Sequence, residues 1–379
     1  MNTRSNKMEL KADVVGSMLR PDYLLKARLQ HKNGEISDAE FKRIEDRAVN
    51  ECIAIQEQSG IDVVTDGEMR RNVFASQLVQ ATEGFEQVSG NFVDWFDMEG
   101  NLQRDPVTVA LVRKIKRKRH LSSEEFSYMR GRTNKLIKVT LPSPTMYAYY
   151  WLPGVSSVAY PSTGEYLAEI GSILTDEVAE LVRLGAQYIQ FDAPEFGMLL
   201  DQHQRNWFKN KGFDPDKLIE DGIEMMNTII DKHQGVTFGL HICRGNDANR
   251  YMAKGDYGRI ARMVFSKIRA QRLLLEYDDE RSGDFSPLQF VPEDKIVVLG
   301  LVTTKTPREE TKEELKTRIK EASRFIPLER LALSTQCGFA SVAKGNNIDF
   351  DTQSRKLKLV ADVAREVWGQ GNSKTEKDK

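Results

Sequence analysis

Short β-rich runs alternate with longer amphipathic stretches along this chain, and this alternation constrains the fold more than any other feature. We predict eight strands, which in chain order are Ala12–Gly16, Ile61–Thr65, Ile137–Leu141, Gln187–Asp192, Val236–Cys243, Arg272–Glu276, Lys295–Val302 and Leu331–Thr335. Helical patterns separate them, such as the capping box of Ser37 and Glu40 that begins a helix ending at Gly60. Eight strand–helix units predict an α/β fold, a parallel (β/α)8 TIM barrel, with an open doubly wound sheet as the alternative.

The length of 379 residues fits a single barrel domain over residues 1–369, and we expect the polar residues 370–379 to be a disordered tail. Roughly 76 residues separate the starts of the second and third strands, whereas a βαβ unit needs only about 30. The excess predicts an insertion at about residues 85–134, which includes Trp95 and the basic run Arg113–His120. We interpret that run as a solvated helix face, and a site for an anionic substrate tail is the alternative.

The charges nearly balance, with 55 Lys+Arg against 56 Asp+Glu and a net charge of −1. This balance argues against nucleic acid as a partner. Apolar stretches such as Ile296 to Val302 are far shorter than a bilayer span, and the N-terminus lacks the apolar segment of a secretory signal. We therefore expect a cytoplasmic protein with no membrane partner, while its oligomeric state stays open. Three cysteines in a reducing compartment point to metal ligation or catalysis rather than to disulfides.

The fifth predicted strand carries two metal-ligating residue types on one face. Alternation along Val236–Cys243 sends Phe238 and Leu240 to one side and His241 and Cys243 to the other. Both residues lie at the carboxyl end of the strand, where barrel enzymes place their chemistry. Taken alone, the pair is better explained by a buried histidine with a backbone partner beside a core cysteine.

The sixth and eighth predicted strands strengthen the metal interpretation. The sixth ends in Glu276 after three leucines, and the eighth leads into Cys337. A buried glutamate needs a partner, and a Zn²⁺ ion supplies one. In a closed barrel these strand ends meet at one mouth, which makes His241, Cys243, Glu276 and Cys337 a candidate zinc shell. Cys52 lies on the apolar stripe of the first long helix, and we expect it to be a core residue.

Several motifs together resemble the catalytic barrel of cobalamin-independent methionine synthase, and in particular its short single-barrel members. The resemblance covers nearly the whole chain. Its motifs are VVGSMLRP (Val14–Pro21), GIDVVTDGEMRRN (Gly60–Asn72), IQFDAPEF (Ile189–Phe196), HICRGN (His241–Asn246), LEYDDERSGDF (Leu275–Phe285), GLVTTKTPREE (Gly300–Glu310) and STQCGFAS (Ser334–Ser341).

The resemblance implies a function and roles for individual residues. The four candidate zinc ligands match the family's ligand positions, while Ser17, Glu68 and Asp192 match positions that hold the amino-acid part of homocysteine. Carboxylates suit the ammonium group of such a zwitterion, and a hydroxyl with backbone N–H groups suits its carboxylate. The implied reaction is methyl transfer to the homocysteine thiol, which Zn²⁺ activates as a thiolate, to form methionine. The implied partners are homocysteine and a methyl donor, either 5-methyltetrahydrofolate or a methyl-carrier protein.

The chain departs from the family in two ways. Many members carry two tandem barrels, and only the catalytic one is present here. Folate-dependent members supply a histidine as proton donor from the loop after the seventh strand, where this chain has Thr304-Lys305-Thr306-Pro307. Lys305 is the candidate in that place, either as the catalytic acid or as the group that holds a phosphate or carboxylate, although a lysine is less well suited than a histidine to proton transfer near pH 7. Trp151 is a candidate for stacking on a pterin, with a place in the core as the alternative.

Two other functions stay open at this point. A related zinc enzyme could transfer an alkyl group to another thiol, as in the addition of coenzyme M to an epoxide, but the acidic residues Glu68 and Asp192 argue against a sulfonate. Zinc could instead be a structural ion held by four protein ligands. Polar groups that converge at a barrel mouth favour an enzyme, a thiol S-methyltransferase.

Overall fold

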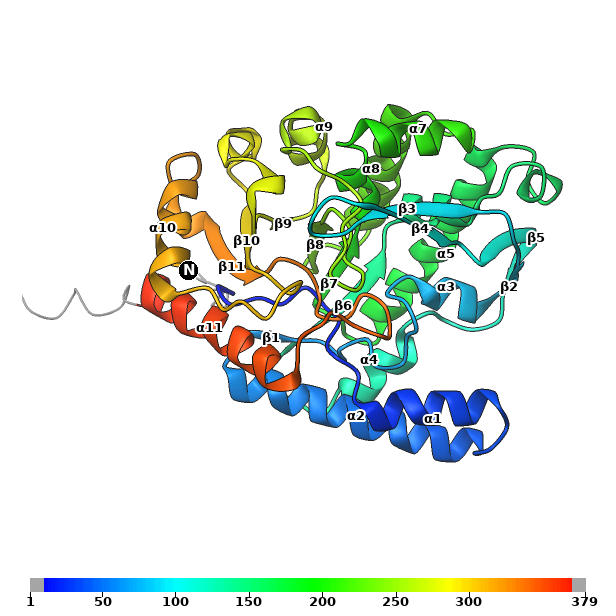
Figure 1. Cartoon of the computed structure of the whole chain (residues 1–379), viewed down its shortest axis with the longest axis horizontal. Helices are drawn as coiled ribbons and strands as arrows, with labels where there is room; N and C mark the ends of the chain where they lie inside the picture. The colour runs from blue at the N-terminus through cyan, green and yellow to red at the C-terminus, as the bar shows by residue number, and fades with distance from the viewer. Residues whose placement is uncertain (1–9, 370–379) are drawn as a thin grey trace, which may run out of the picture.

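The computed structural model describes residues 10–369, so the expected disordered tail lies outside the described residues. Its centre is a curled sheet of seven parallel strands, in which each strand pairs with the next one along the sheet (Figure 1). In order across the sheet, the strands are β1 (Val63–Val64), β6 (Leu136–Pro142), β7 (Tyr188–Asp192), β8 (Thr237–Ile242), β9 (Arg272–Glu276), β10 (Ile296–Val302) and β11 (Leu331–Thr335). The fold is therefore α/β with a parallel, curled sheet, as the alternation of strand and helix patterns predicted.

Seven of the eight predicted strands are confirmed, but the first, Ala12–Gly16, is wrong. Residues 12–16 form only a bridge between Ala12 and Leu333 of β11. On the other side, the Asp62 carboxylate accepts hydrogen bonds of 2.8 Å from the amides of Lys11 and Ala12. A side chain thus binds amides that the carbonyl groups of a neighbouring strand would bind in a regular ladder. The closed eight-stranded barrel is accordingly not confirmed.

β1 is much shorter than the predicted strand Ile61–Thr65, also because of a side chain. The amide of Gln56 accepts from the Thr65 N–H at 3.0 Å and donates to the Thr65 carbonyl at 2.8 Å. Both backbone groups of Thr65 are therefore occupied, and the ladder to β6 ends at Val64.

The longer helices cover the outer face of the curled sheet (Figure 1). The α-helices are α1 (Asp22–Lys32), α2 (Asp38–Ser59), α3 (Ser76–Ala81), α4 (Ser123–Met129), α5 (Thr163–Arg183), α6 (Pro194–Met198), α7 (Gln202–Asn210), α8 (Pro215–Asp231), α9 (Gly258–Lys267), α10 (Lys312–Ala322) and α11 (Phe350–Trp368). Short 3-10 helices are η1 (Pro144–Tyr150), η2 (Ser156–Val158), η3 (Glu280–Ser282), η4 (Ser286–Phe290) and η5 (Leu328–Arg330). Ser37 caps α2 by accepting from the Glu40 amide, and Gly60 ends it with φ 82°, as the sequence predicted. No helix within residues 10–369 is long and apolar enough to cross a membrane.

Between β1 and β6 the chain forms two antiparallel ribbons. One pairs β2 (Thr82–Gln87) with β5 (Val109–Arg117), and the other pairs β3 (Phe92–Phe96) with β4 (Leu102–Pro106). The basic run begins on β5 and not on a helix, so that part of the prediction is wrong, although Arg113 is solvated and paired with Glu86. Phe96 and Tyr251 exchange two backbone hydrogen bonds of 2.8 and 2.9 Å. These bonds tie the β3–β4 hairpin to the loop that follows β8.

Candidate metal centre and substrate cavity

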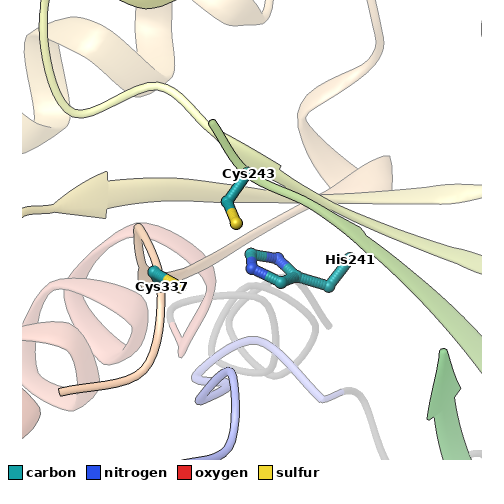
Figure 2. Close-up of side chains that lie close together, drawn as sticks. All are labelled: His241, Cys243 and Cys337. Carbon is teal, nitrogen blue, oxygen red and sulfur yellow. The ribbon is translucent and has the colours of Figure 1, made fainter. Parts of the chain in front are cut away.

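Three predicted metal ligands come together at the carboxyl ends of two strands of the sheet. His241 lies near the end of β8, Cys243 follows that strand, and Cys337 lies two residues beyond β11. Their ligand atoms all lie within 4.8 Å of one another, and the three side chains point toward a common centre (Figure 2). All three are buried. One imidazole and two thiols at this separation are the donor set of a zinc site.

His241 is oriented to offer one ring nitrogen to a metal. Its Nδ1 lies 3.1 Å from the Leu274 carbonyl oxygen, and because a carbonyl only accepts, Nδ1 must carry the proton. Nε2 then presents a lone pair, and this buried atom has no hydrogen-bond partner. A backbone carbonyl behind a histidine is the usual way in which proteins fix a metal-ligating ring.

Glu276, the fourth predicted ligand, lies at the end of β9 beside β8 but is not part of the three-residue cluster. Its Oε2 accepts a hydrogen bond of 2.6 Å from the Arg244 amide, and its Oε1 is buried without a partner. An unpartnered carboxylate oxygen is costly in a protein interior. Glu276 is therefore a carboxylate with one oxygen fixed and one oxygen left for a further ligand, and the donor set as a whole fits zinc.

The two thiols of the cluster differ in acidity. The pKa of Cys337 lies well below its ordinary value, chiefly because Cys243 donates toward its sulfur and also because His241 lies beside it. The same contact, together with burial, raises the pKa of Cys243 well above its ordinary value. Cys337 is therefore the more easily ionised thiol of the pair, and a divalent cation bound here would favour the thiolate form of both cysteines.

A cavity of about 330 Å³ opens beside this cluster, and the three clustered residues line it. The predicted substrate residues Ser17, Glu68 and Asp192 line the same cavity. The structure therefore brings together six of the nine residues that the sequence singled out. Glu276 and Lys305 lie behind this lining, and Trp151 lies elsewhere.

Ser17 is held against the segment that follows β11. The amide of Phe339 donates to the Ser17 carbonyl at 2.8 Å, and the amide of Ala340 lies 3.4 Å from Ser17 Oγ. A Cβ at Gly338 would lie only 2.0 Å from that hydroxyl oxygen. The residue after the Cys337 ligand must therefore be glycine for Ser17 to approach so closely.

Glu68 lies on a strained turn at the cavity wall. It has a positive φ of 56°, next to Gly67 with φ 67°. Its Oε1 accepts from Thr140 at 3.0 Å and lies 3.4 Å from the Arg71 guanidinium, while its buried Oε2 has no partner. Burial raises the pKa of Glu68 above its ordinary value. Strain and an unpaired carboxylate oxygen at one residue are features of ligand-binding sites.

Asp192 ends β7, directly beside His241 of β8. Gln190 donates to its Oδ1 at 2.6 Å. Burial raises the pKa of Asp192 to about 7. A nearby cation, such as the ammonium group of a ligand, would stabilise the ionised form of this carboxyl group.

Lys305 is fully buried but does not line the cavity. Its Nζ donates to the Gly245 carbonyl at 3.0 Å and to Asn246 Oδ1 at 3.3 Å. It thereby ties the loop after β10 to the loop that follows Cys243. The ammonium group therefore contacts the back of the lining, because Gly245 and Asn246 both line the cavity.

Trp151 is a core residue in this structure, so the stacking prediction is not supported. Its ring packs against Tyr166 with centroids 5.6 Å apart and against Phe213 at 6.4 Å, and it does not line the cavity. The run of tyrosines before it does contribute, because Tyr149 and Tyr150 of η1 line the cavity.

The insertion supplies a wall of the cavity that the sequence did not reveal. Val93, Trp95 and residues 105–109 line it from β3, β4 and the start of β5. The strand spacing indicated extra chain at this point but carried no information about where it packs. Arg250, in the loop after β8, also connects that loop to the insertion. It pairs with Asp105 of β4 at 2.5 Å and with Asp247 of its own loop at 2.8 Å.

Comparison with known proteins agrees with this geometry. The family model described as "Cobalamin-independent synthase, Catalytic domain" matches residues 10–365. The chain is similar to "Uncharacterized protein YxjH" of Bacillus subtilis (strain 168), with 31% identity over 96% of both chains. It is also similar to the methionine synthase of Pyrococcus abyssi, with 26% identity over 97% of this chain and 96% of that one. A B12-independent methionine synthase from Shewanella sp. W3-18-1, solved in complex with selenomethionine, has the same fold, with a TM-score of 0.71 and 19% identity over 94% of this chain and 97% of that one.

Proposed function

The chain belongs to the family of cobalamin-independent methionine synthase catalytic domains, a family of methyltransferases, and from this premise we propose that it methylates the thiol of homocysteine to form methionine. One observation carries the proposal. The cluster of His241, Cys243 and Cys337 opens into the same cavity as a hydroxyl and two carboxyl groups. A thiol-activating site and a site for an amino acid are therefore within reach of one small molecule.

We propose zinc as the cofactor, with His241, Cys243, Cys337 and Glu276 as its ligands. The unpartnered Nε2 of His241 and Oε1 of Glu276 support this set, since each is a buried donor atom that lacks a ligand. When bound, zinc lowers the pKa of a coordinated thiol so that it is a thiolate at neutral pH. Two thiolate ligands would make the metal electron-rich. Such a metal is suited to holding a nucleophilic substrate thiolate and less suited to polarising a carbonyl group as a Lewis acid.

Ser17, Glu68 and Asp192 are the proposed contacts of the amino-acid part. The ammonium group of homocysteine suits Glu68 and Asp192, which are buried carboxyl groups in the cavity lining. Glu68 pairs with Arg71 through Oε1, while its Oε2 has no partner. The hydroxyl of Ser17 suits the substrate carboxylate. The complex of the Shewanella protein with selenomethionine supports a pocket for an amino acid of this shape.

The alternative, alkyl transfer to a sulfonate thiol such as coenzyme M, finds less support. A sulfonate needs cationic partners, and no lysine or arginine lines the cavity within the described residues. Competition between homocysteine and mercaptoethanesulfonate, followed by thiol consumption, separates the two substrates.

The test of the proposed function compares the three cysteines. Zinc content and methionine formation are measured for the wild type and for Cys243→Ser, Cys337→Ser and the control Cys52→Ser. Cys52 is buried in α2, with Gln56 at 3.2 Å from its sulfur. We expect the first two variants to lose zinc and activity and the control to keep both. A metal-free wild type, or Cys243→Ser with undiminished zinc and methionine formation, contradicts the proposal.

We further propose that residues 1–369 act as one unit, with residues 10–16 taking the place of an eighth strand. The amide of Asp13 donates to Leu333 of β11, and the amide of Asp62, next to β1, donates to Ala12. These two bonds bridge the edges of the sheet. Three free thiols suit a reducing compartment, so we place the enzyme in the cytoplasm.

A further inference from the structure

The cavity is larger than the amino-acid site needs, and the insertion builds its far wall. Around Trp95 the lining is apolar and aromatic, with Phe74, Tyr149 and Tyr150 also exposed to the cavity. Three methionines, Met146, Met198 and Met252, complete it. A second, mainly apolar substrate therefore has room beside the thiol site.

The charges of this lining have one sign. Glu68, Asp105, Asp192 and Asp247 line the cavity, whereas no lysine or arginine does so within the described residues. Two guanidinium groups lie just outside the lining: Arg250 pairs with Asp105 and Asp247 and lies over the Trp95 ring at 5.2 Å, and Arg71 lies 3.4 Å from Glu68 Oε1. The four carboxyl groups of the lining outnumber these two guanidinium groups. Two buried lysines lie behind the lining, where Lys305 donates to the Gly245 carbonyl and Lys211 to the Tyr149 carbonyl. The lining therefore offers a bound cation carboxyl groups and aromatic rings, whereas an anion such as the homocysteine carboxylate has only neutral polar groups like the Ser17 hydroxyl as partners there.

From these observations we propose that the methyl donor is a small methylsulfonium cation. The inference rests on the proposed function, since it concerns the second substrate of the same reaction. Aromatic rings attract a cation at close range, and the carboxylates add to that attraction. A donor with a chain of carboxylates finds no cationic partner in the lining. The basic run of β5 does not compensate, since Arg113 and Arg117 are paired with Glu86 and Asp176 and lie outside the lining.

A sulfonium donor also removes the need for a catalytic acid. The thiol first loses its proton to solvent. The thiolate sulfur of homocysteine then attacks the methyl carbon, a new S–C bond forms, the C–S⁺ bond breaks, and its electron pair stays on the departing sulfur. An anion and a cation give two neutral thioethers, and no proton is transferred in this step. Among residues 10–369, no lysine belongs to the lining, and its one histidine, His241, belongs to the metal cluster.

The first experiment separates this inference from the proposed function. Zinc-loaded protein and homocysteine are incubated with trimethylsulfonium, S-methylmethionine, a methylated folate triglutamate or methylcobalamin, and methionine is quantified. Homocysteine binding is measured in parallel by calorimetry. We expect methionine from a sulfonium, with trimethylsulfonium releasing one dimethyl sulfide per methionine. Methionine from the folate or the cobalamin at ten times the sulfonium rate overturns the inference. Binding of homocysteine without any sulfonium turnover also overturns it but leaves the thiol site standing, whereas absence of homocysteine binding refutes the proposed function.

The second experiment adds a positive charge to the cavity wall that the insertion builds. Val107 lines the cavity from the insertion and is half-buried. Val107→Lys adds a cation, and Val107→Met is the matched uncharged control of similar length. We expect KM for trimethylsulfonium to be at least tenfold higher in the lysine variant than in the methionine variant. The inference is refuted if Val107→Lys has the same KM for trimethylsulfonium as Val107→Met but a lower KM for a folate donor.

The third experiment tests the aromatic contact. Trp95→Leu should raise KM for trimethylsulfonium by about tenfold relative to Trp95→Phe, because only the phenylalanine keeps a ring face for the cation. Tetramethylammonium should inhibit the wild type competitively, and the neutral tert-butanol, of similar shape, should not. Equal inhibition by both compounds shows that the site recognises shape and not charge, which is incompatible with the inference.

Discussion

Replacing Gly338 by alanine tests the close contact between the loop that carries a metal ligand and the loop that carries Ser17. An added Cβ would lie 2.0 Å from Ser17 Oγ, 3.0 Å from Ser17 N and 3.1 Å from Ser17 Cβ. The φ of Gly338 is not in the left-handed region, so the effect comes from space alone. Overpacking of this kind costs about 1–3 kcal/mol of unfolding free energy. We also expect homocysteine to bind at least tenfold more weakly, which corresponds to about 1.4 kcal/mol.

The assay combines urea unfolding of the zinc-loaded protein with calorimetric titration of homocysteine. Gly164→Ala is the control, because Gly164 lies in α5 with its nearest neighbour atom at 3.8 Å. The double variant Gly338→Ala with Ser17→Gly removes the two side-chain atoms that clash. It should recover at least half of the lost stability but none of the lost affinity, because the hydroxyl is then missing. Gly338→Ala with wild-type stability and affinity, or a stability loss that the double variant does not relieve, refutes the reasoning.

Three further predictions concern buried charges around the site. Burial raises the pKa of Glu195 from 4.5 to about 7, so its contribution to stability is full below pH 4.5 and is lost as the pH rises through 7. Glu195→Gln should therefore reduce the pH dependence of the unfolding free energy, measured in urea, by up to about 1.4 kcal/mol per pH unit between pH 4.5 and 7. An unchanged pH dependence would contradict this. Arg250→Met should accelerate amide hydrogen exchange in residues 92–106, since the Asp105 ion pair is lost; unchanged exchange there would show that the backbone bonds alone hold the hairpin. Lys305→Met should lower stability by about 1–3 kcal/mol, because the Gly245 carbonyl loses its partner, with less than a tenfold change in kcat. A fall in kcat of about a hundredfold with an altered pH profile would identify Lys305 as a proton donor instead.

The metal cluster could be predicted from the sequence because strand alternation is a local property. His241 and Cys243 lie two residues apart at a strand end, and that spacing alone places both side chains on one face. Cys337 followed from a different argument: the eighth predicted strand leads into it, and the carboxyl ends of parallel strands meet at one mouth. The cavity contacts Ser17, Glu68 and Asp192 needed the resemblance to a family, since no local pattern links three such distant positions.

The remaining features depend on contacts that a sequence does not show. The strand predicted at 12–16 failed because the side chain of Asp62 binds amides that a strand would have paired. The aromatic side chain of Trp151 would suit either a ligand contact or the core. Its packing against Tyr166 and Phe213, which the sequence does not show, places it in the core. The place of the insertion is set by backbone bonds between Phe96 and Tyr251, which lie far apart in the chain.

The two sides of the cavity have different origins in the chain, and this difference bears on how such enzymes diversify. The side with the metal cluster is assembled from loops after β1, β7, β8 and β11, so a change in any one of them disturbs a geometry that the others share. Much of the opposite wall is one contiguous segment, residues 93–109. A single exchange of that segment between homologues would replace this wall and leave the ligand-bearing strands untouched. Such an exchange keeps the thiol chemistry only if the new segment also keeps its bonds to Tyr251 and Arg250 in the loop after β8.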